Sequence, residues 1–381
     1  MHPALDKRVF DKEAVSLVNH GFEVVHIAPD ENPKTWNEKG VDIITYDRPG
    51  GLKGRILQLK KLYTMAKQVN ADVYHCNEVD SWFVGVFLKL RFGKPCVFDV
   101  HEHYPEEFAQ TRFPQLVQPL VTLFISVLMT FLSFFTTRVV LAKKSLERDF
   151  RFYSSKNIVA VQNFSPIASF TNIHDCDATD SEQTILRDTP LKLIHLGLIN
   201  RNRGWPQILE GLSIAKNKNV ELSILGKMND GSQQEFESAI MSLGLSERVQ
   251  FESWLPIDEA LKKVNVCDVG LIMFQPGLFN HVHALPHKLF DYMGSKLAVI
   301  APRFAVEVSE IVSRSDCGIL VDSSSAESFA AAIDCLSEDR AACKAYGEKG
   351  SHAVLTNYNW ETEEKMLVNM YKELAKQYTV Y

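Results

Sequence analysis

The chain has 381 residues, enough for two domains of ordinary size or three smaller ones, which excludes a peptide hormone or a small binding module. Hydrophobic residues make up 46% and charged residues 23% of it, so collagen-like and largely disordered classes are also excluded. Because 41 Lys and Arg stand against 47 Asp and Glu, the net charge is −6, and we expect no nucleic-acid partner held by a global basic field.

The seven cysteines are scattered, without a C-x-x-C pair and without a histidine at zinc-ligand spacing. This pattern predicts reduced cysteines in a cytosolic compartment. The first residues lack an apolar stretch behind a basic start, so they do not read as a secretory signal.

Short β-branched or aromatic runs alternate with longer segments over the first half of the chain, which predicts a parallel, doubly wound α/β sheet. The same alternation restarts near residue 191 and predicts a second such domain. The expected strands are Phe22–Ala28, Val41–Tyr46, Asp72–His75, Pro95–Val100, Arg138–Ala142 and Asn157–Val161, then Leu191–Leu196, Val220–Leu225, Arg248–Phe251, Asp268–Met273, Leu297–Ala301 and Cys317–Val321.

Between these halves the pattern stops, in a stretch rich in Ser, Thr and Asp. We therefore expect an N-terminal domain over 1–165, a linker over 166–190 and a C-terminal domain over 191–356. Apolar residues at helical spacing after Trp360, with acidic residues first and basic ones later, predict a final helix within 357–381. This helix is expected to pack back on the N-terminal domain.

The most informative motif is HVHALPHKLFDYMGSKLAVIAP, residues 281–302. It resembles the nucleotide-binding element of retaining glycosyltransferases with two Rossmann-like domains, most closely the large family 4. A helix that begins near Pro286, after a strand, presents free N–H groups and its positive end to a diphosphate at the strand ends. The resemblance implies a fold with two such domains facing across a cleft, and donor-binding roles for His283, Pro286, Lys288, Leu289 and Asp291.

Two of these positions depart from the family pattern. Asp291, expected to accept hydrogen bonds from the ribose, stands where the family more often has Glu. His283 stands where many members have a sugar-binding Glu, which leaves the donor sugar open.

A second motif, IHLGLINRNRGW at 194–205, resembles the family's glycine turn after the first strand of the donor domain. Gly197 permits a tight exit from the strand. The resemblance places Arg203 on the donor diphosphate, where it would stabilise the leaving group. Many members carry another Arg where this chain has Leu198, so Arg201 or Lys227 is expected to supply the second contact.

In the first domain, VFDVHEHYPEEF at 97–108 ends a strand in a polar cluster and resembles a variant found in a subset of these transferases. We expect His101 beside the reacting sugar, and Glu102 either in the cleft or at a helix start. Asp6 and Arg8 are expected on the acceptor side. Side chains alternate along an extended segment, so residues 101 and 103 point to one side and residue 102 to the other. No third ligand is evident, so no metal site is expected.

The opening segment resembles the family's first helix and second strand, and the strand that should precede them is absent. A doubly wound sheet without its first strand would have a slot at its centre, and the strands beside this slot would have backbone N–H and C=O groups without partners. We therefore expect a truncated or misassigned start, with reduced stability or activity of this chain.

Residues 113–137 carry no charge, and their densest part is LVTLFISVLMTFLSFF at 120–135. Three alternatives remain: an interfacial helix near 115–135 docked on a membrane surface, a buried helix or protein interface, and a true span. The first is favoured, because hydroxyls recur along one helical stripe. Basic residues near the run would then meet anionic lipid: Arg112, Arg138, Lys143, Lys144, Arg148 and Arg151.

Together these features predict a retaining glycosyltransferase that moves a hexosyl or N-acetylhexosaminyl unit from a UDP-, GDP- or similar nucleotide-sugar without a metal cofactor. The acceptor is expected to be a lipid-linked glycan or a polysaccharide of lipopolysaccharide or capsule type. The protein would be cytoplasmic and peripheral at the inner face of a bacterial membrane. The alternatives are a nucleotide-sugar 2-epimerase and an inactive sugar-nucleotide-binding partner.

Overall fold

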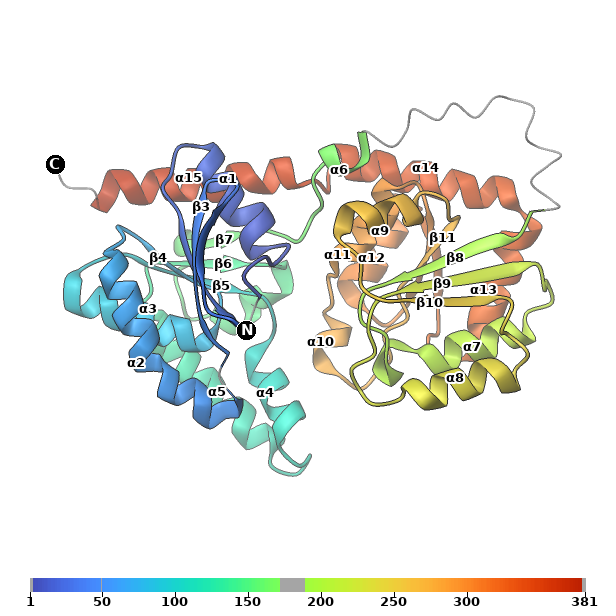
Figure 1. The fold of residues 1–381 in the computed structure, drawn as a ribbon, viewed down its shortest axis with the longest axis horizontal. Coiled ribbons are helices and arrows are strands. Elements are labelled where there is room, and N and C mark those ends of the chain that lie inside the picture. The colour runs from blue at the N-terminus through green and yellow to red at the C-terminus, as the bar shows by residue number, and fades with distance from the viewer. Residues whose placement is uncertain (1–2, 49, 172–188, 379–381) are drawn as a thin grey trace. The chain divides into compact units, whose positions relative to one another are not determined.

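The computed structural model describes residues 3–48, 50–171 and 189–378 (Figure 1). Most of the expected linker, residues 172–188, therefore lies outside the described residues. The chain divides into two compact units. Unit 1 comprises Met1–Asn163 and Trp360–Tyr381, and unit 2 comprises Phe164–Asn359.

Unit 1 has a strand at each of the six predicted positions and one strand that the sequence did not predict. The extra strand, β2, pairs antiparallel with β3 through a turn in which Lys39 (φ 50°) and Gly40 (φ 82°) both adopt positive φ. The strands of this unit are β1 Val25–Asp30, β2 Thr35–Glu38, β3 Val41–Asp47, β4 Tyr74–Cys76, β5 Cys96–Val100, β6 Arg138–Leu141 and β7 Ile158–Ala160.

These strands form two separate sheets instead of one. One sheet has the order β1-β3-β2 and the other β4-β5-β6-β7, and every pairing except β2–β3 is parallel. The division falls between β1 and β4, which do not pair with each other among the described residues.

Helices cover both sheets of unit 1. On one side Trp82, from α3 Val79–Phe92, stacks on Phe98 of β5 with ring centroids 3.9 Å apart. The last helix, α15 Trp360–Tyr378, buries Leu367 and Leu374 in a cluster that includes Val140 of β6. The other helical elements are η1 Val9–Ala14, α1 Val15–Asn19, α2 Gly51–Val69, α4 Tyr104–Arg112, α5 Gln118–Ser133, η2 Lys144–Phe150 and η3 Ser155–Asn157.

Helix α5 lies within the uncharged stretch and is apolar on two sides. Met129 and Leu132 on one side are buried in the core of unit 1. The opposite face stays exposed over the whole helix, as its large side chains show: Leu120 70%, Leu123 62%, Phe124 66%, Val127 60% and Phe131 58% exposed. No helix among the described residues is long and apolar enough to cross a membrane.

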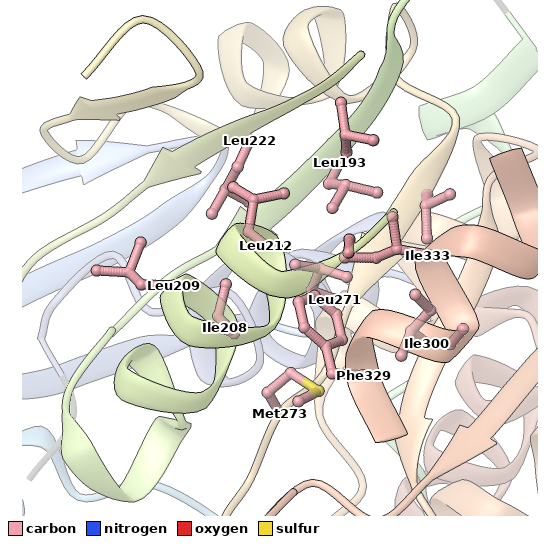
Figure 2. Close-up of a cluster of buried hydrophobic side chains, with 14 of the residues drawn as sticks. Leu193, Ile208, Leu209, Leu212, Leu222, Leu271, Met273, Ile300, Phe329 and Ile333 are labelled. Atoms are coloured by element: carbon pink, nitrogen blue, oxygen red, sulfur yellow. The ribbon is translucent and has the colours of Figure 1, made fainter. Parts of the chain in front are cut away.

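Unit 2 has one parallel six-stranded sheet in the order β10-β9-β8-β11-β12-β13. Leu193, Leu271 and Ile300 from its central strands pack against helices α7 Trp205–Ile214 and α13 Ala326–Glu338, which supply Leu212 and Phe329 (Figure 2). The strands are β8 Leu191–Leu196, β9 Val220–Leu225, β10 Val249–Glu252, β11 Val269–Leu271, β12 Ala298–Pro302 and β13 Gly318–Val321. The remaining helices are α6 Ala168–Thr171, α8 Gln233–Ser242, α9 Ile257–Val264, α10 Phe279–Val282, α11 His287–Gly294, α12 Val306–Ser315 and α14 Arg340–Thr356.

Candidate functional site

The turn after β8 brings the ends of two strands close together. Gly197 leaves the strand with φ 89°, and its N–H donates to the carbonyl of Leu225, 2.8 Å away. A Cβ on Gly226 would stand 1.8 Å from the Gly197 oxygen, so a side chain cannot be accommodated there. Ile199 then donates to the carbonyl of Lys227 at 3.0 Å, which fixes the loop against the end of β9.

Arg203 is positioned by a short capped turn. The side-chain oxygen of Asn200 accepts a hydrogen bond from the N–H of Arg203 at 2.9 Å. Gly204 follows with φ 80°, packed so closely that a Cβ would lie 2.4 Å from the Met273 carbonyl oxygen. The guanidinium of Arg203 then lies 4.8 Å from the centre of the Phe274 ring. This geometry holds the guanidinium at the end of β11.

A buried lysine and a buried histidine lie next to this arginine. Lys288, in the first turn of α11, is 8% exposed, and its Nζ lies 3.3 Å from Nε2 of His195 on β8. Burial, and then the charge of Arg203, lower the pKa of Lys288 well below its usual value. Burial and the charges of Lys288 and Arg203 likewise lower the pKa of His195. We refer to Arg203, Lys288 and His195 as the basic cluster.

The basic cluster lies at the start of α11, whose N-cap is Pro286. The first N–H groups of a helix lack intrahelical acceptors and carry the positive end of its dipole. Basic side chains that lie close together at such a place repel each other when charged, and a bound anion offsets this repulsion. The arrangement is therefore suited to a phosphate or diphosphate.

The other donor-side residues have different surroundings. Asp291 is buried, and its Oδ1 accepts a hydrogen bond from the hydroxyl of Ser165 at 2.7 Å. Leu289 is part of the hydrophobic core of unit 2. His283 ends α10, with its ring 4.7 Å from that of Phe279. A hydrogen bond between Asp291 and the ribose of the donor stays a prediction. The carboxylate would then accept hydrogen bonds from both the ribose and Ser165.

The two residues expected to compensate for Leu198 are exposed. Arg201 forms an ion pair with Glu235, and its guanidinium lies 5.3 Å from the centre of the Trp205 ring. Lys227 is exposed at the end of β9, where its carbonyl holds the Gly197 loop. Neither appears among the groups that shift the pKa of Lys288 or His195, whereas Arg203 does.

In unit 1, Arg8 lies at the centre of a buried ion-pair network. Its Nε and Nη2 donate to both carboxylate oxygens of Asp99 at 3.0 and 2.8 Å, and Nη2 also lies 2.9 Å from Glu13 Oε1. Nη1 donates to the Val161 carbonyl at 2.7 Å and to Asn163 Oδ1 at 3.0 Å. The guanidinium is thus engaged with protein groups on every side, which is the environment of a structural residue.

The polar cluster after β5 is tied to this network. His101 Nε2 lies 2.7 Å from Asp99 Oδ2. Burial raises the pKa of Asp99, but the charges of Arg8 and His101 outweigh it and hold that pKa well below its usual range. Glu102 is exposed, and Asp6 accepts hydrogen bonds from the backbone N–H groups of Arg8 and Val9. The ion pair with Asp99 therefore sets the orientation of the His101 ring.

Among the described residues, two sets of side chains have metal-ligand types within reach of one another: Glu13, His75 and Asp99, and His103, Glu106 and Asp149. In the first set Arg8 already bridges the two carboxylates. In the second, Arg148 pairs with both Glu106 and Asp149. An arginine therefore supplies the positive charge in each set that a metal would otherwise bring.

Sequence reasoning missed His195, Asp99 and Ser165 as partners of the expected site residues. His195 lies two residues before Gly197, within the quoted motif, and a histidine inside a buried strand was the available signal. The same holds for Asp99, an acid in the apolar run at 95–100. Ser165 carries no local signal, because its partner Asp291 is 126 residues away in the chain.

Two Rossmann-like α/β units in one chain are the architecture of the GT-B class. Residues 8–164 match the family model for Glycosyltransferase Family 4, and residues 177–353 match the model for Glycosyl transferases group 1. The chain therefore belongs to the family 4 type of glycosyltransferases, and its activity is glycosyl transfer. No curated protein sequence matches it.

Solved structures of low sequence identity share the fold. The sucrose-phosphate synthase of Thermosynechococcus elongatus is 16% identical with a TM-score of 0.74, over 96% of this chain and 92% of that one. Anabaena HepE in complex with UDP is 15% identical with a TM-score of 0.67, over 92% and 100%. WaaG, a glycosyltransferase involved in lipopolysaccharide biosynthesis, is 14% identical with a TM-score of 0.67, over 97% and 96%.

Proposed function

We propose that the chain is a retaining glycosyltransferase that transfers a hexosyl or N-acetylhexosaminyl unit from a UDP-, GDP- or similar nucleotide-sugar to a lipid-linked glycan or polysaccharide. The basic cluster at the start of α11 carries this proposal, because it offers a diphosphate a helix N-terminus and the side chains of Arg203 and Lys288. HepE, which shares the fold, has been solved with UDP and with UDP-glucose.

In this proposal Arg203 and Lys288 stabilise the departing nucleoside diphosphate. Negative charge grows on the diphosphate as the glycosidic bond breaks, and fixed positive groups lower the energy of that transition state. The acceptor hydroxyl attacks from the same face, and its proton passes to the leaving phosphate oxygen, so the configuration is retained. The buried carboxylates Asp99 and Glu13 are held by Arg8, which argues against their use in a double displacement.

We propose that His101, in unit 1, contacts the donor sugar. Its Nε2 lies 2.7 Å from Asp99 Oδ2, which orients the imidazole ring that we propose contacts a hydroxyl of the donor sugar. Asp99 then acts as a positioning residue that fixes the ring orientation. The predicted signature of His101→Ala is a lower kcat with little change in nucleotide affinity, because the nucleotide binds to unit 2.

Nucleotide binding tests the donor half of the proposal. UDP and GDP titrated calorimetrically should bind the full chain, and Arg203→Ala should weaken the preferred nucleotide by about tenfold to a hundredfold, as loss of a charge-assisted hydrogen bond predicts. Arg201→Ala, which removes an exposed arginine paired with Glu235, is the matched control and should bind almost as the parent does. Equal losses in both variants would contradict the assignment of the basic cluster.

Product analysis tests the reaction class. With a labelled nucleotide-sugar and membrane extract as the acceptor source, NMR of the product should show the same anomeric configuration as the donor. Incubation with the donor alone distinguishes the epimerase alternative, since rearranged sugar would replace the slow hydrolysis expected of a transferase. Nucleotide binding that survives Arg203→Ala, together with no transfer, would favour an inactive binding partner.

For the acceptor side we propose that the exposed apolar face of α5 rests on the membrane surface. Five large apolar side chains along this face are more than half exposed, as is usual for a surface that meets another phase or partner. Two of the basic residues expected beside it are unavailable, because Lys143 is buried and Arg138 bonds Thr137 and Asn157. Arg151, exposed and stacked on Phe152, can still meet anionic lipid.

Vesicle sedimentation tests this part separately. The parent chain should bind vesicles containing anionic lipid, and Phe124→Asp/Phe131→Asp should abolish binding without changing the thermal unfolding midpoint. Met241→Asp places a charge at an apolar residue of α8 that is 68% exposed, and serves as the control. Vesicle binding that persists in the double variant would refute the role of α5.

A further inference from the structure

Lys288 and His195 of the basic cluster form a buried pair of basic groups. The side chain of His195 is fully buried, and that of Lys288 is 8% exposed. Nζ of the lysine lies 3.3 Å from Nε2 of the histidine. Two positive charges at this distance, away from water, would repel each other strongly. The geometry therefore disfavours a state in which both groups are protonated.

Among the described residues, the surroundings of the pair add positive charge and no negative charge. Arg203 is the charged group that shifts the pKa of Lys288, and Arg203 and Lys288 both act on His195. The strands packed against α11, β11 and β12, have no titratable side chain. Asp291, the acid of α11 itself, accepts a hydrogen bond from Ser165 and is not among the groups that shift either pKa.

The other charged residues of the neighbouring elements are paired or exposed. On β8 and β9, Lys192 and Glu221 are register partners at the start of the strands, whereas His195 lies near the end of β8. Helix α14, which packs on α11, carries ion pairs with groups outside the cluster and two exposed basic residues: Arg340 with Asp268, Glu348 with Lys296, Lys349 with Asp316, and then Lys344 and His352. The described residues therefore offer no carboxylate to neutralise a protonated Lys288.

The hydrogen-bond geometry favours one tautomer of His195. Nε2 lies 3.1 Å from the carbonyl oxygen of Leu198, whereas Nδ1 has no hydrogen-bond partner among the described residues. Because a carbonyl oxygen can only accept, we assign the ring hydrogen to Nε2. Nδ1 is then a bare acceptor, and no N–H group is buried without an acceptor.

This tautomer determines how Lys288 can interact with the ring. A charged ammonium group has only donors, and a ring nitrogen that carries a hydrogen has no lone pair to offer it. A neutral amine has a lone pair and can accept from the N–H at Nε2. Burial, and then the charge of Arg203, act in the same direction, because they lower the pKa of Lys288 well below its usual value. These features favour a neutral Lys288 in the free protein.

A bound diphosphate would reverse this preference. At mildly alkaline pH its phosphates are fully ionised, because phosphate groups lose their last proton near pH 6. An anion beside Arg203 and the start of α11 supplies the negative charge that the pair lacks, and an opposite charge nearby favours the charged form of a lysine. The ammonium group can then donate to phosphate oxygens, while Nε2 of His195 keeps its contact with Leu198.

We propose that a nucleoside diphosphate binds to the basic cluster together with one proton, which passes from the solvent to Nζ of Lys288, and that His195 is the positioning residue that holds the neutral amine in the free protein. This inference rests on the proposed function, because it concerns the same donor site. Since the proton is a reactant in binding, affinity falls as the pH rises between the lower pKa of Lys288 in the free protein and its higher pKa in the complex, by up to about tenfold per pH unit.

Titration calorimetry of the full chain with UDP and with GDP measures the proton directly. The heat observed at one pH varies with the ionisation enthalpy of the buffer in proportion to the protons exchanged, so titrations in several non-phosphate buffers give their number. At about pH 8 uptake should approach one proton per nucleotide, and the dissociation constant should rise by up to about tenfold toward pH 9. Histidines with an ordinary pKa of about 6.5 are neutral throughout this range and do not contribute.

Two lysine variants and the histidine spectrum locate the proton. Lys288→Arg stays charged throughout, so it should bind the nucleotide without proton uptake and with an affinity that changes little with pH. Lys262→Arg, the same substitution at an exposed lysine of α9, is the matched control and should take up the proton as the parent does. In NMR, nucleotide should move Cε of Lys288 from its neutral to its charged shift, while Nε2 of His195 keeps its hydrogen in both states.

The outcomes separate this inference from the proposed function. If neither UDP nor GDP binds, the donor half of the proposed function fails and the proton coupling fails with it. If a nucleotide binds and Arg203→Ala weakens it, but no proton is taken up, or Lys288→Arg takes up as much as the parent, the donor site stands and the coupling is overturned. Should Lys288→Arg fail to fold, the parent spectrum decides, because a Lys288 that is already charged in the free protein at about pH 8 contradicts the proposal.

Discussion

Replacing Arg8 by Leu should destabilise unit 1 severely. The guanidinium makes five polar contacts inside the unit, two of them to Asp99 and one to Glu13, and both carboxylates are buried. Removing one partner of a buried ion pair leaves the other charge without compensation and costs about 3–5 kcal/mol. Since domains are stable by only about 5–15 kcal/mol, this is a large share of the total.

Urea unfolding followed by far-UV circular dichroism and tryptophan fluorescence measures the effect. With a slope of about 2 kcal/mol per molar urea, the midpoint of unit 1 should fall by roughly 2 M. Arg148→Leu is the matched control, because this arginine is 47% exposed and its ion pairs should contribute at most about 1 kcal/mol. The triple variant Arg8→Met/Asp99→Leu/Glu13→Leu should recover much of the loss, because no buried charge remains unpaired.

An Arg8→Leu chain within about 1 kcal/mol of the parent would refute a structural role for this network. If the same variant raised KM for an acceptor while stability stayed unchanged, Arg8 would be an acceptor contact, as the sequence predicts. A structural role instead moves the unfolding midpoint and leaves nucleotide affinity in unit 2 unaffected at temperatures where both units are folded.

Three further variants test single features of the two units. Gly204→Ala should lower the free energy of unfolding by about 1–3 kcal/mol in urea, because φ is 80° and the added Cβ would lie 2.4 Å from the Met273 oxygen. Gly21→Ala is the control, and it should lower the free energy of unfolding by less, because φ is 85° there but the space around the added Cβ is open. Lys288→Met should raise the melting temperature of the free protein and weaken UDP or GDP in calorimetry. Because the folded pKa of Lys288 is depressed, parent stability should rise with pH toward the ordinary lysine pKa, and the variant should lose this rise. His75 has a pKa of about 4 when folded against about 6.5 unfolded, so its contribution should decline by about 2 kcal/mol from pH 7 to pH 5, and His75→Gln should show a correspondingly flatter pH profile.

Local pattern was sufficient for elements whose signal lies within one run of residues. The final helix follows from apolar spacing and from acids that precede bases, and α15 begins at the predicted Trp360 and ends at Tyr378. Strand β2 was missed because it depends on a turn in which Lys39 and Gly40 take positive φ, and its own sequence, TWNE, lacks a β-branched run. Turn geometry of this kind is only weakly encoded when the first residue is a lysine.

The site was harder to predict, because its energetics depend on residues far apart in the chain. Lys288 was expected near a diphosphate from the motif alone, but its depressed pKa arises from burial beside Arg203, which lies 85 residues earlier by number, and it also contacts His195. Arg8 was assigned to the acceptor because of its place in the opening segment, and the bond to Asp99, 91 residues away, gives it a different environment. Contacts between residues this far apart leave no periodic pattern in the sequence, so they cannot be predicted from it.

The net charge, from which a nucleic-acid partner was excluded, does not show how the charged residues are distributed between the two units. A net charge of −6 describes the whole chain, yet the basic cluster collects Arg203, Lys288 and His195 at one helix start. Unit 1 does the reverse, and places the carboxylates of Asp99 and Glu13 around a single arginine. Because attraction between charges grows as they leave water, a few buried groups outweigh the exposed majority that sets the net charge. The anion binding proposed for unit 2 and an internally neutralised network in unit 1 are therefore compatible with one mildly acidic chain.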